Sequence, residues 1–260
     1  MTPIRLNKII SHNTRYSRRE ADELIKQGHV KIDGKVVSDL STKVTFADKV
    51  TVKGRRLFEK DGYTVVVYNK PKGELVSKRD DRGRKTIYDS LPKKFSHYLS
   101  VGRLDFASEG LLLLTDSPRV ATALMEGDLE RVYYVKINGE ITPSMESAMR
   151  EGLIAQDARK GGHQDSKIFS MEFAPFANYR IIKNRPTYST LKVTIKEGKN
   201  RELRRFFAYF DAEVVDLKRV SYGIVDLGML KPGKTRYLEA NEYKALRDYL
   251  NYWEKSGDSQ

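Results

Sequence analysis

From residue 63 onward, the chain carries strand-length apolar segments that are interleaved irregularly with segments of helical periodicity. The expected strands lie at 63–68, 97–101, 110–115, 131–138, 167–173, 188–196 and 213–219. The expected helices lie at 118–126, 143–152, 199–210 and 241–252. A strict alternation of strand and helix would favour a parallel sheet. Its absence predicts an α+β domain with a mixed, mainly antiparallel sheet.

The first part of the chain has a different order, with two helices followed by a β-ribbon. Ser17 precedes the segment RREADELIKQG, and together with Glu20 it has the spacing of a capping box at a helix start. The pair Asp33-Gly34 predicts the turn of a hairpin. We therefore expect a small domain over 1–56, a polar linker over 57–62, a second domain over 63–253 and a frayed tail over 254–260.

The net charge of the chain is +13, and much of it comes from the first 60 residues. Such a charge is typical of a protein that binds a polyanion, and nucleic acid is the first candidate, although a solubilising surface gives the same composition. Arg15, Arg18 and Arg19 cluster near the second expected helix, where phosphates could lie across one face. A solvated helix face is an equal alternative for these side chains.

The composition also excludes several kinds of site. The chain has no cysteine, which rules out a disulfide, a thiolate nucleophile and a cysteine-containing zinc site. Its histidines have no metal-ligand spacing, and neither a P-loop nor a dinucleotide-binding glycine motif is present, so we expect no metal and no cofactor. No apolar run approaches the ~20 residues of a membrane span, and a signal-peptide core is absent. We expect a cytoplasmic monomer without membrane contact.

The stretch LSVGRLDFASEGLLLLTD carries the main candidate for chemistry. An apolar strand, a polar loop that contains Asp105, and a second apolar strand follow one another. A carboxylate beside Arg103 at such a junction can stay ionised and oriented, although aspartate is also common in turns. The whole stretch is similar to the signature motif of RNA pseudouridine synthases of the RsuA/RluB branch. This resemblance implies that Asp105 is the catalytic aspartate and that Arg103, Ser108 and Glu109 shape the loop around a flipped nucleotide.

Further segments resemble the same family and occur in its order. VVVYNKPKGEL implies a basic turn in which Lys70 and Lys72 contact phosphate, although Pro-Gly turns are common in other settings. ERVYYVKINGE is similar to the family's strand that carries the active-site tyrosine, which corresponds to Tyr133 rather than Tyr134. Neighbouring side chains on a strand point to opposite faces, so only one of the two tyrosines can face the site.

The segment LKVTIKEGKNRELRRFF resembles the family helix that completes the site. The resemblance implies that Arg204 forms an ion pair with the catalytic aspartate, and a guanidinium in that place would hold the carboxylate ionised. It also implies that Leu203 forms a wall of the base pocket, while Arg201 and Arg205 remain for polar contacts with substrate. Near the N-terminus, RLNKII and SRREADELIKQGHVKIDGKVV resemble the alpha-L RNA-binding domain, named from a ribosomal small-subunit protein.

Together these resemblances imply site-specific isomerisation of uridine to pseudouridine in rRNA, by base flipping, cleavage of the glycosidic bond and carbon-carbon rejoining, without a cofactor. Arg131 and Glu202 are similar to the branch that acts on 23S rRNA, which favours the large subunit, with 16S rRNA second. A non-catalytic rRNA-binding assembly factor is the rival, and the intact Asp105, Tyr133 and Arg204 argue against it. Attack by Asp105 on the sugar and removal of a sugar proton both stay open.

Overall fold

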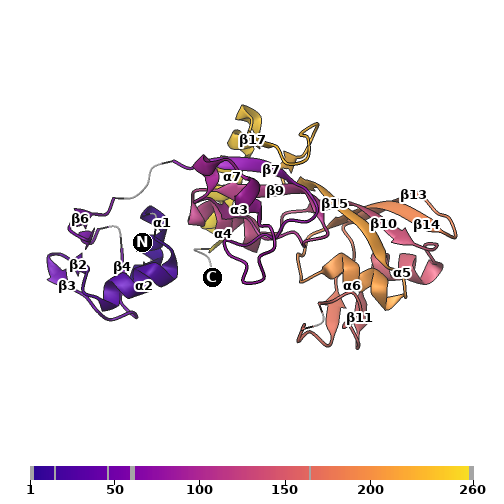
Figure 1. The fold of residues 1–260 in the computed structure, drawn as a ribbon, viewed down its shortest axis with the longest axis horizontal. Coiled ribbons are helices and arrows are strands. Elements are labelled where there is room, and N and C mark those ends of the chain that lie inside the picture. The colour runs from indigo at the N-terminus through magenta and orange to yellow at the C-terminus, as the bar shows by residue number, and fades with distance from the viewer. Residues whose placement is uncertain (1–2, 15, 46, 59–61, 164, 258–260) are drawn as a thin grey trace. The chain divides into compact units, whose positions relative to one another are not determined.

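The computed structural model describes residues 3–14, 16–45, 47–58, 62–163 and 165–257 (Figure 1). Contacts within the chain group it into two units. The first comprises 1–64, 97–99 and 115–122, and the second comprises 65–96, 100–114 and 123–260. Helices and strands occur in both units, which confirms the predicted α+β class. None of the helices in the described ranges is long and apolar enough to cross a membrane.

The described residues of the first unit up to 58 form two short helices and two small antiparallel sheets. These elements are β1 (Ile4–Arg5), α1 (Leu6–Asn13), α2 (Arg18–Lys26), β2 (Val30–Ile32), β3 (Lys35–Val36), β4 (Lys43–Val44), β5 (Val50–Val52) and β6 (Arg55–Arg56). The strand orders of the two sheets are β1-β4 and β3-β2-β5-β6. The predicted capping box is present, because Ser17 Oγ accepts from the Glu20 amide at 3.2 Å and Glu20 Oε2 accepts from the Ser17 amide at 2.7 Å. The expected hairpin turn is also present, with positive φ at Asp33 and Gly34.

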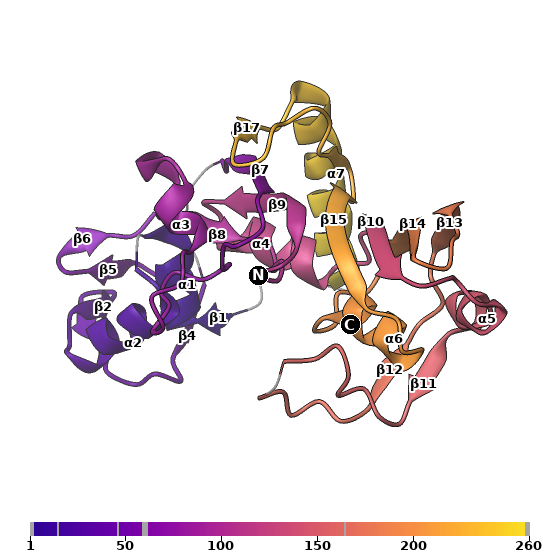
Figure 2. The ribbon, with the colours of Figure 1, turned by 45° about the vertical axis from the view of Figure 1, so that its right-hand side comes forward.

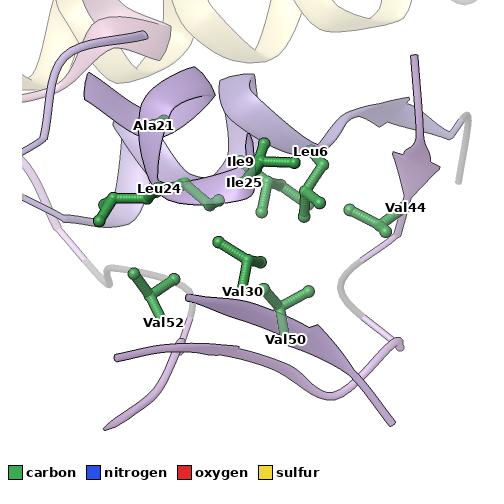
Figure 3. Packing of buried hydrophobic residues seen from close by; sticks show 10 residues of the cluster. Leu6, Ile9, Ala21, Leu24, Ile25, Val30, Val44, Val50 and Val52 are labelled. Atoms are coloured by element: carbon green, nitrogen blue, oxygen red, sulfur yellow. The ribbon is translucent and has the colours of Figure 1, made fainter. Parts of the chain in front are cut away.

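One apolar cluster holds this unit together (Figure 3). Figure 3 shows side chains of the helices facing those of the strands, which closes the core between the two layers. The buried members are Leu6, Ile9, Ile10, Ala21, Leu24, Ile25, Val30, Val44, Val50 and Val52. Apolar burial of this kind supplies about 25 cal/mol per Å² and accounts for a small domain at this end of the chain.

The second unit is built on a sheet whose described strands run in the order β13-β14-β10-β15-β9-β7-β17, with β16 paired to β15 and β8 to β9. The bounds are β7 (Val65–Lys70), β8 (Leu99–Ser100), β9 (Glu109–Thr115), β10 (Arg131–Asn138), β13 (Asn178–Lys183), β14 (Tyr188–Ile195), β15 (Val214–Tyr222), β16 (Val225–Asp226) and β17 (Thr235–Tyr237). Six pairs of neighbouring strands in this sheet have a defined register. Strands β9 and β15 pair in parallel, and the other five pairs are antiparallel. Figure 2 shows β15, β10, β14 and β13 following one another across the sheet.

The remaining elements connect these strands. They are α3 (Ile87–Ser90), the short 3-10 helix Lys93–Phe95, α4 (Pro118–Glu126), α5 (Pro143–Glu151), the ribbon strands β11 (Leu153–Ala155) and β12 (Met171–Phe173), α6 (Glu202–Tyr209) and α7 (Ala240–Gly257). Helix α6 packs on β15, and Phe206 of α6 contacts Phe173 and Phe176. These contacts fix the start of α6 near the β15 part of the sheet.

Several expected bounds need correction. The strands expected at 97–101 and 167–173 are shorter in the structure, at Leu99–Ser100 and Met171–Phe173, although the Val101 amide still donates to the carbonyl oxygen of Leu113 in β9 at 2.8 Å. Strand β13 was not expected, since most of its side chains are exposed and break the apolar pattern. Helix α7 continues to Gly257, so residues 254–257 of the predicted frayed tail are helical, and 258–260 lie outside the described residues. Positions 59–61 of the predicted linker also lie outside them.

One glycine allows the parallel pairing that brings β9 against β15. Gly110 pairs with Arg219 and has a φ of +104°. A Cβ atom at this position would lie 2.1 Å from the carbonyl oxygen of Arg219. Any side chain would therefore push the two strands apart. Because the loop that contains Asp105 leads directly into β9, this contact places that loop beside β15.

Candidate active site

A cavity of about 290 Å³ lies where the loop before β9, strands β10 and β15, and the start of α6 meet. It is lined by Gly102, Arg103, Leu104, Asp105, Ser108, Met125, Arg131, Tyr133, Ile195, Gly198, Lys199, Arg201, Glu202, Leu203, Leu217, Arg219 and Tyr222. The lining brings together residues from sequence segments that are far apart. Asp105, Tyr133 and Leu203, which the sequence placed at one site, all belong to it.

The carboxylate of Asp105 lies between two guanidinium groups. Arg201 Nη1 is 3.2 Å from Asp105 Oδ2, and Arg204 Nε is 3.5 Å from the same oxygen. The predicted pair with Arg204 is present, but Arg201 is the nearer cation, which the sequence did not indicate. Two guanidinium groups at these distances orient the carboxylate. Because the side chain of Asp105 is still 29% exposed, its carboxylate can meet a ligand in the cavity.

Arg204 is held in place by the backbone on both sides of the site. Its Nη1 donates to the carbonyl oxygen of Val214 at 2.9 Å, and its Nη2 donates to the carbonyl oxygen of Ala107 at 3.3 Å and to Ser108 Oγ at 3.2 Å. Burial lowers the pKa of the Arg204 guanidinium, and the charge of Asp105 opposes this effect. Ser108, predicted to contact substrate, is only 1% exposed and serves as an acceptor for Arg204.

Lys70 does not reach a phosphate, which corrects the prediction from its basic turn. Its side chain is fully buried at the end of β7, and Nζ donates to the carbonyl oxygens of Pro71, Asp105 and Ser108 at 2.9, 3.2 and 2.8 Å. Burial lowers the pKa of Lys70 to about 8. The lysine therefore fixes the backbone of the loop that carries Asp105. Its position at the end of an uninterrupted apolar strand is the sequence signal for this role.

Arg205 also differs from the expected substrate contact, whereas the phosphate contact of Lys72 stays a prediction. Lys72 Nζ forms an ion pair with Asp216 Oδ1 at 2.8 Å, and its side chain is partly exposed. Arg205 is only 1% exposed and donates to the carbonyl oxygen of Ala158, to Ser166 Oγ at 2.7 Å and to Asn200. It therefore binds the loop after β11 to the start of α6, and it is not available to a ligand.

Tyr133 faces the cavity and Tyr134 faces away from it. Tyr133 is 7% exposed, whereas Tyr134 is 41% exposed on the opposite face of β10. Arg219 Nη1 lies 3.5 Å from the Tyr133 hydroxyl oxygen, and Arg219 Nε donates to the carbonyl oxygen of Leu111 at 2.7 Å. Among the described residues, Arg219 Nη2 is buried without a hydrogen-bond partner. Arg219 thus lines the cavity beside Tyr133, and within the described residues one of its buried donors is unsatisfied.

Sequence reasoning gave no role in the cavity to Arg219, Tyr222 or Met125. Arg131, noted only as a subgroup feature, donates to the Tyr222 hydroxyl at 3.1 Å, and its guanidinium lies 4.9 Å from the centre of that ring. Arg219 lies 5.0 Å from the centre of the same ring. The expected strand at 213–219 contains Arg219, and strand alternation from the apolar Leu217 could have placed this arginine on the inner face.

Glu202 is a buried carboxyl group in the cavity wall. It is 5% exposed, and Oε2 accepts from the Lys199 amide at 3.0 Å. Burial raises the pKa of Glu202 to about 7. This carboxyl group can therefore carry a proton near neutral pH.

The remaining predicted contacts are Arg103 in the catalytic unit and Arg15, Arg18 and Arg19 near the N-terminus. Arg103 is exposed at the edge of the cavity. In the N-terminal unit, Arg18 and Arg19 are exposed in the first turn of α2, and Arg15 lies outside the described residues. Within the ranges that the structure describes, no group of three or more His, Asp or Glu side chains could hold a metal ion.

Comparisons with known proteins agree with this geometry. Residues 64–209 match a family model described as RNA pseudouridylate synthase, and residues 4–50 match the S4 domain. An uncharacterized RNA pseudouridine synthase from Helicobacter pylori is 51% identical over 95% of both chains. The ribosomal large subunit pseudouridine synthase B of Bacillus subtilis is 34% identical over 94% of this chain and 95% of its own. A crystal structure of a pseudouridylate synthase aligns with a TM-score of 0.63 at 27% identity, covering 94% of this chain and 99% of the other.

Proposed function

Since this chain belongs to the RNA pseudouridylate synthase family, we propose that it isomerises a specific uridine of 23S large-subunit rRNA. The observation that carries the proposal is the Asp105 carboxylate, which two arginines hold in a cavity with Tyr133 and Leu203. The choice of large-subunit rRNA rests on the similarity to the Bacillus subtilis enzyme. The S4 domain match supports RNA binding by the N-terminal region.

In the proposed mechanism, the target uridine leaves its stack and enters the cavity, at a cost of a few kcal/mol that contacts to the RNA backbone offset. Leu203 and Tyr133 would contact the faces of the base. The bond from C1′ of ribose to N1 of uracil then breaks, and the electron pair goes to N1. After the base has turned, C5 bonds to C1′, C5 loses its proton and N1 gains one. All other atoms of the nucleotide are retained, so the residues of this chain need only hold groups and move protons.

Asp105 would act on the sugar, either by attack at the anomeric carbon or by removal of a sugar proton. Both roles need a carboxylate oxygen held at the sugar, and Arg201 and Arg204 contact Asp105 Oδ2 at 3.2 and 3.5 Å. Tyr133 would stack on the base and assist removal of the C5 proton. The unpartnered Nη2 of Arg219, among the described residues, would donate to a uracil oxygen.

The test is the incubation of the protein with unmodified bacterial 23S and 16S transcripts, followed by pseudouridine mapping. We expect one site in 23S rRNA with the wild-type chain and none with Asp105→Asn, because the amide cannot act as nucleophile or base. Product only in 16S rRNA would favour the small-subunit alternative. RNA binding without product in either transcript would favour a non-catalytic assembly factor.

A further inference from the structure

The face of the sheet opposite Tyr133 is a second surface of the catalytic unit, and its side chains include several cations and exposed tyrosine rings. Side chains alternate along β10, so Tyr134 and Lys136 lie on the face away from the cavity. Tyr134 pairs with Lys192 of β14 and with Lys218 of β15. Arg180 of β13 pairs with Lys192 in turn. We call these four strands' exposed side the outer face.

The pairing register arranges the cations of the outer face in rows. The first row runs Arg180, Lys192, Tyr134, Lys218 across β13, β14, β10 and β15. In the next row, Thr190 of β14 lies between two lysines. Lys183 of β13 pairs with it on one side, and Lys136 of β10 pairs with it on the other. Side chains directly opposite each other on neighbouring strands have Cβ atoms about 5 Å apart. Five cations therefore lie within two adjacent rows.

The charges of these rows are poorly compensated within the chain. None of the five cations forms an ion pair among the described residues. Two carboxylates lie at the β15 end. Asp216 is already paired with Lys72 at 2.8 Å, and Glu109 pairs in register with Lys218 without forming an ion pair. Like charges directly opposite each other, such as Arg180 and Lys192, destabilise a sheet unless an anion from outside compensates them.

Exposed aromatic rings are interleaved with the cations. Tyr134 is 41% exposed in the middle of the first row, and Tyr188 is 44% exposed at the far end of β14. The ammonium of Lys136 lies 4.4 Å from the centre of the Tyr188 ring. An exposed ring between two lysines offers a flat apolar surface beside positive charge. Surfaces that bind single-stranded nucleic acid combine these two features, with bases stacked on the rings and phosphates beside the cations.

We propose that the outer face binds a segment of RNA, with phosphates held by Arg180, Lys192 and Lys218 and a base stacked on Tyr134. The surface lies on the opposite side of the sheet from the catalytic cavity, so it is a separate contact from that of the reacting nucleotide. This inference rests on the proposed function in one respect, namely that the polyanion is RNA. An acidic protein would satisfy the charges but would leave the exposed tyrosine ring without its stacking partner.

The test measures the affinity for an unmodified bacterial 23S rRNA transcript as a function of salt concentration. The variant is Arg180→Gln combined with Lys192→Gln and Lys218→Gln. The matched control is Lys231→Gln combined with Lys234→Gln and Lys244→Gln, three exposed cations near β17 and on α7. Both proteins lose the same charge. We expect the variant to bind about tenfold more weakly than the control at moderate salt and its log–log salt slope to be smaller by roughly 2.

A second pair of variants tests the stacking contact separately from charge. Tyr134→Phe keeps the ring and should bind 23S rRNA like the wild-type protein, whereas Tyr134→Leu should bind on the order of tenfold more weakly. The proposal is overturned if the triple variant and its control give equal affinity and slope, or if Tyr134→Leu binds as tightly as Tyr134→Phe. Binding through the outer face without any pseudouridine product would keep this inference and reject the proposed function. If the protein forms pseudouridine but the triple variant and its control bind 23S rRNA equally well, the proposed function is kept and this inference is rejected.

Discussion

At the scale of single residues, the main finding is that Asp105 is held by two arginines and that the nearer one was not predicted. Arg201 adopts a left-handed backbone conformation at the N-cap of α6, with a φ of 53°, which is uncommon for a residue with a side chain. From there its Nη1 reaches Asp105 while its Nε donates to the carbonyl oxygen of Gly161 at 2.7 Å. Such strain is retained where the surrounding structure requires it. We therefore assign Arg201 a positioning role beside Arg204.

The two arginines should differ when each is replaced by alanine. Arg201→Ala should lower kcat about 10- to 100-fold, the effect of losing one charge-assisted contact, and should destabilise the fold less than Arg204→Ala because it leaves one carbonyl oxygen, that of Gly161, without its donor. Arg204→Ala should lower kcat similarly and also destabilise the fold, because it leaves the carbonyl oxygens of Val214 and Ala107 without their donor. Single-turnover kinetics and thermal denaturation of both variants provide the measurement. Unchanged kcat in Arg201→Ala would exclude the positioning role.

Glu202 should make stability depend on pH. Its pKa is about 7 in the folded chain and 4.5 ordinarily, so the folded state binds the proton more tightly. A proton bound more tightly in the folded state stabilises it below pH 4.5, and this contribution is lost as pH rises through 7. The pKa difference corresponds to about 3 kcal/mol.

We therefore expect the free energy of unfolding of the wild-type chain to fall between pH 5 and pH 8 more steeply than that of Glu202→Gln. The amide cannot ionise but can still accept from the Lys199 amide. Urea denaturation at several pH values measures the difference, and parallel curves for the two proteins would contradict the assigned pKa. Glu140→Gln, which removes one carboxylate from an exposed position, serves as the control.

At the scale of elements, the contact between β9 and β15 determines where the Asp105 loop lies. Gly110 allows the backbones to approach, and Lys70 of β7 then binds two carbonyl oxygens of the loop itself. The amide of Gly73 in the following turn also donates to the carbonyl oxygen of Phe106 at 2.8 Å. The basic turn after β7 thus acts as a backbone support for the loop.

Gly110→Ala should therefore destabilise the catalytic unit by about 3–5 kcal/mol, from overlap with Arg219 and from backbone strain. Gly139→Ala is the matched control, because Gly139 also has a positive φ but no atom lies within 4 Å of its added Cβ. This control should cost only about 1 kcal/mol of strain. Thermal and urea denaturation compare the two, and equal destabilisation would show that the close approach of β9 and β15 is not limiting.

At the scale of the whole molecule, positive charge is spread over surfaces of both units. The outer face of the sheet and the exposed first turn of α2 both carry unburied cations. Phosphate contact by Arg18 and Arg19 stays a prediction, and the salt dependence of RNA binding measures it in the same way as for the outer face. Several contacts with a long polyanion would explain a net charge of +13 better than one small cavity does.

The sequence by itself determined the α+β class, the capping box of α2 and the hairpin turn at Asp33-Gly34, because local patterns carry that information. It also determined the grouping of Asp105, Tyr133 and Leu203, because motif resemblance carries it. Only the tertiary structure decided what the basic side chains do. Arg and Lys look alike in a sequence whether they meet solvent, a ligand or a buried carbonyl oxygen. Lys70 and Arg205 became internal supports and Arg201 the nearest cation to Asp105 because strands and loops distant in sequence surround them. The outer face likewise exists only through the register of four strands, of which only β13 and β14 follow one another directly in the chain.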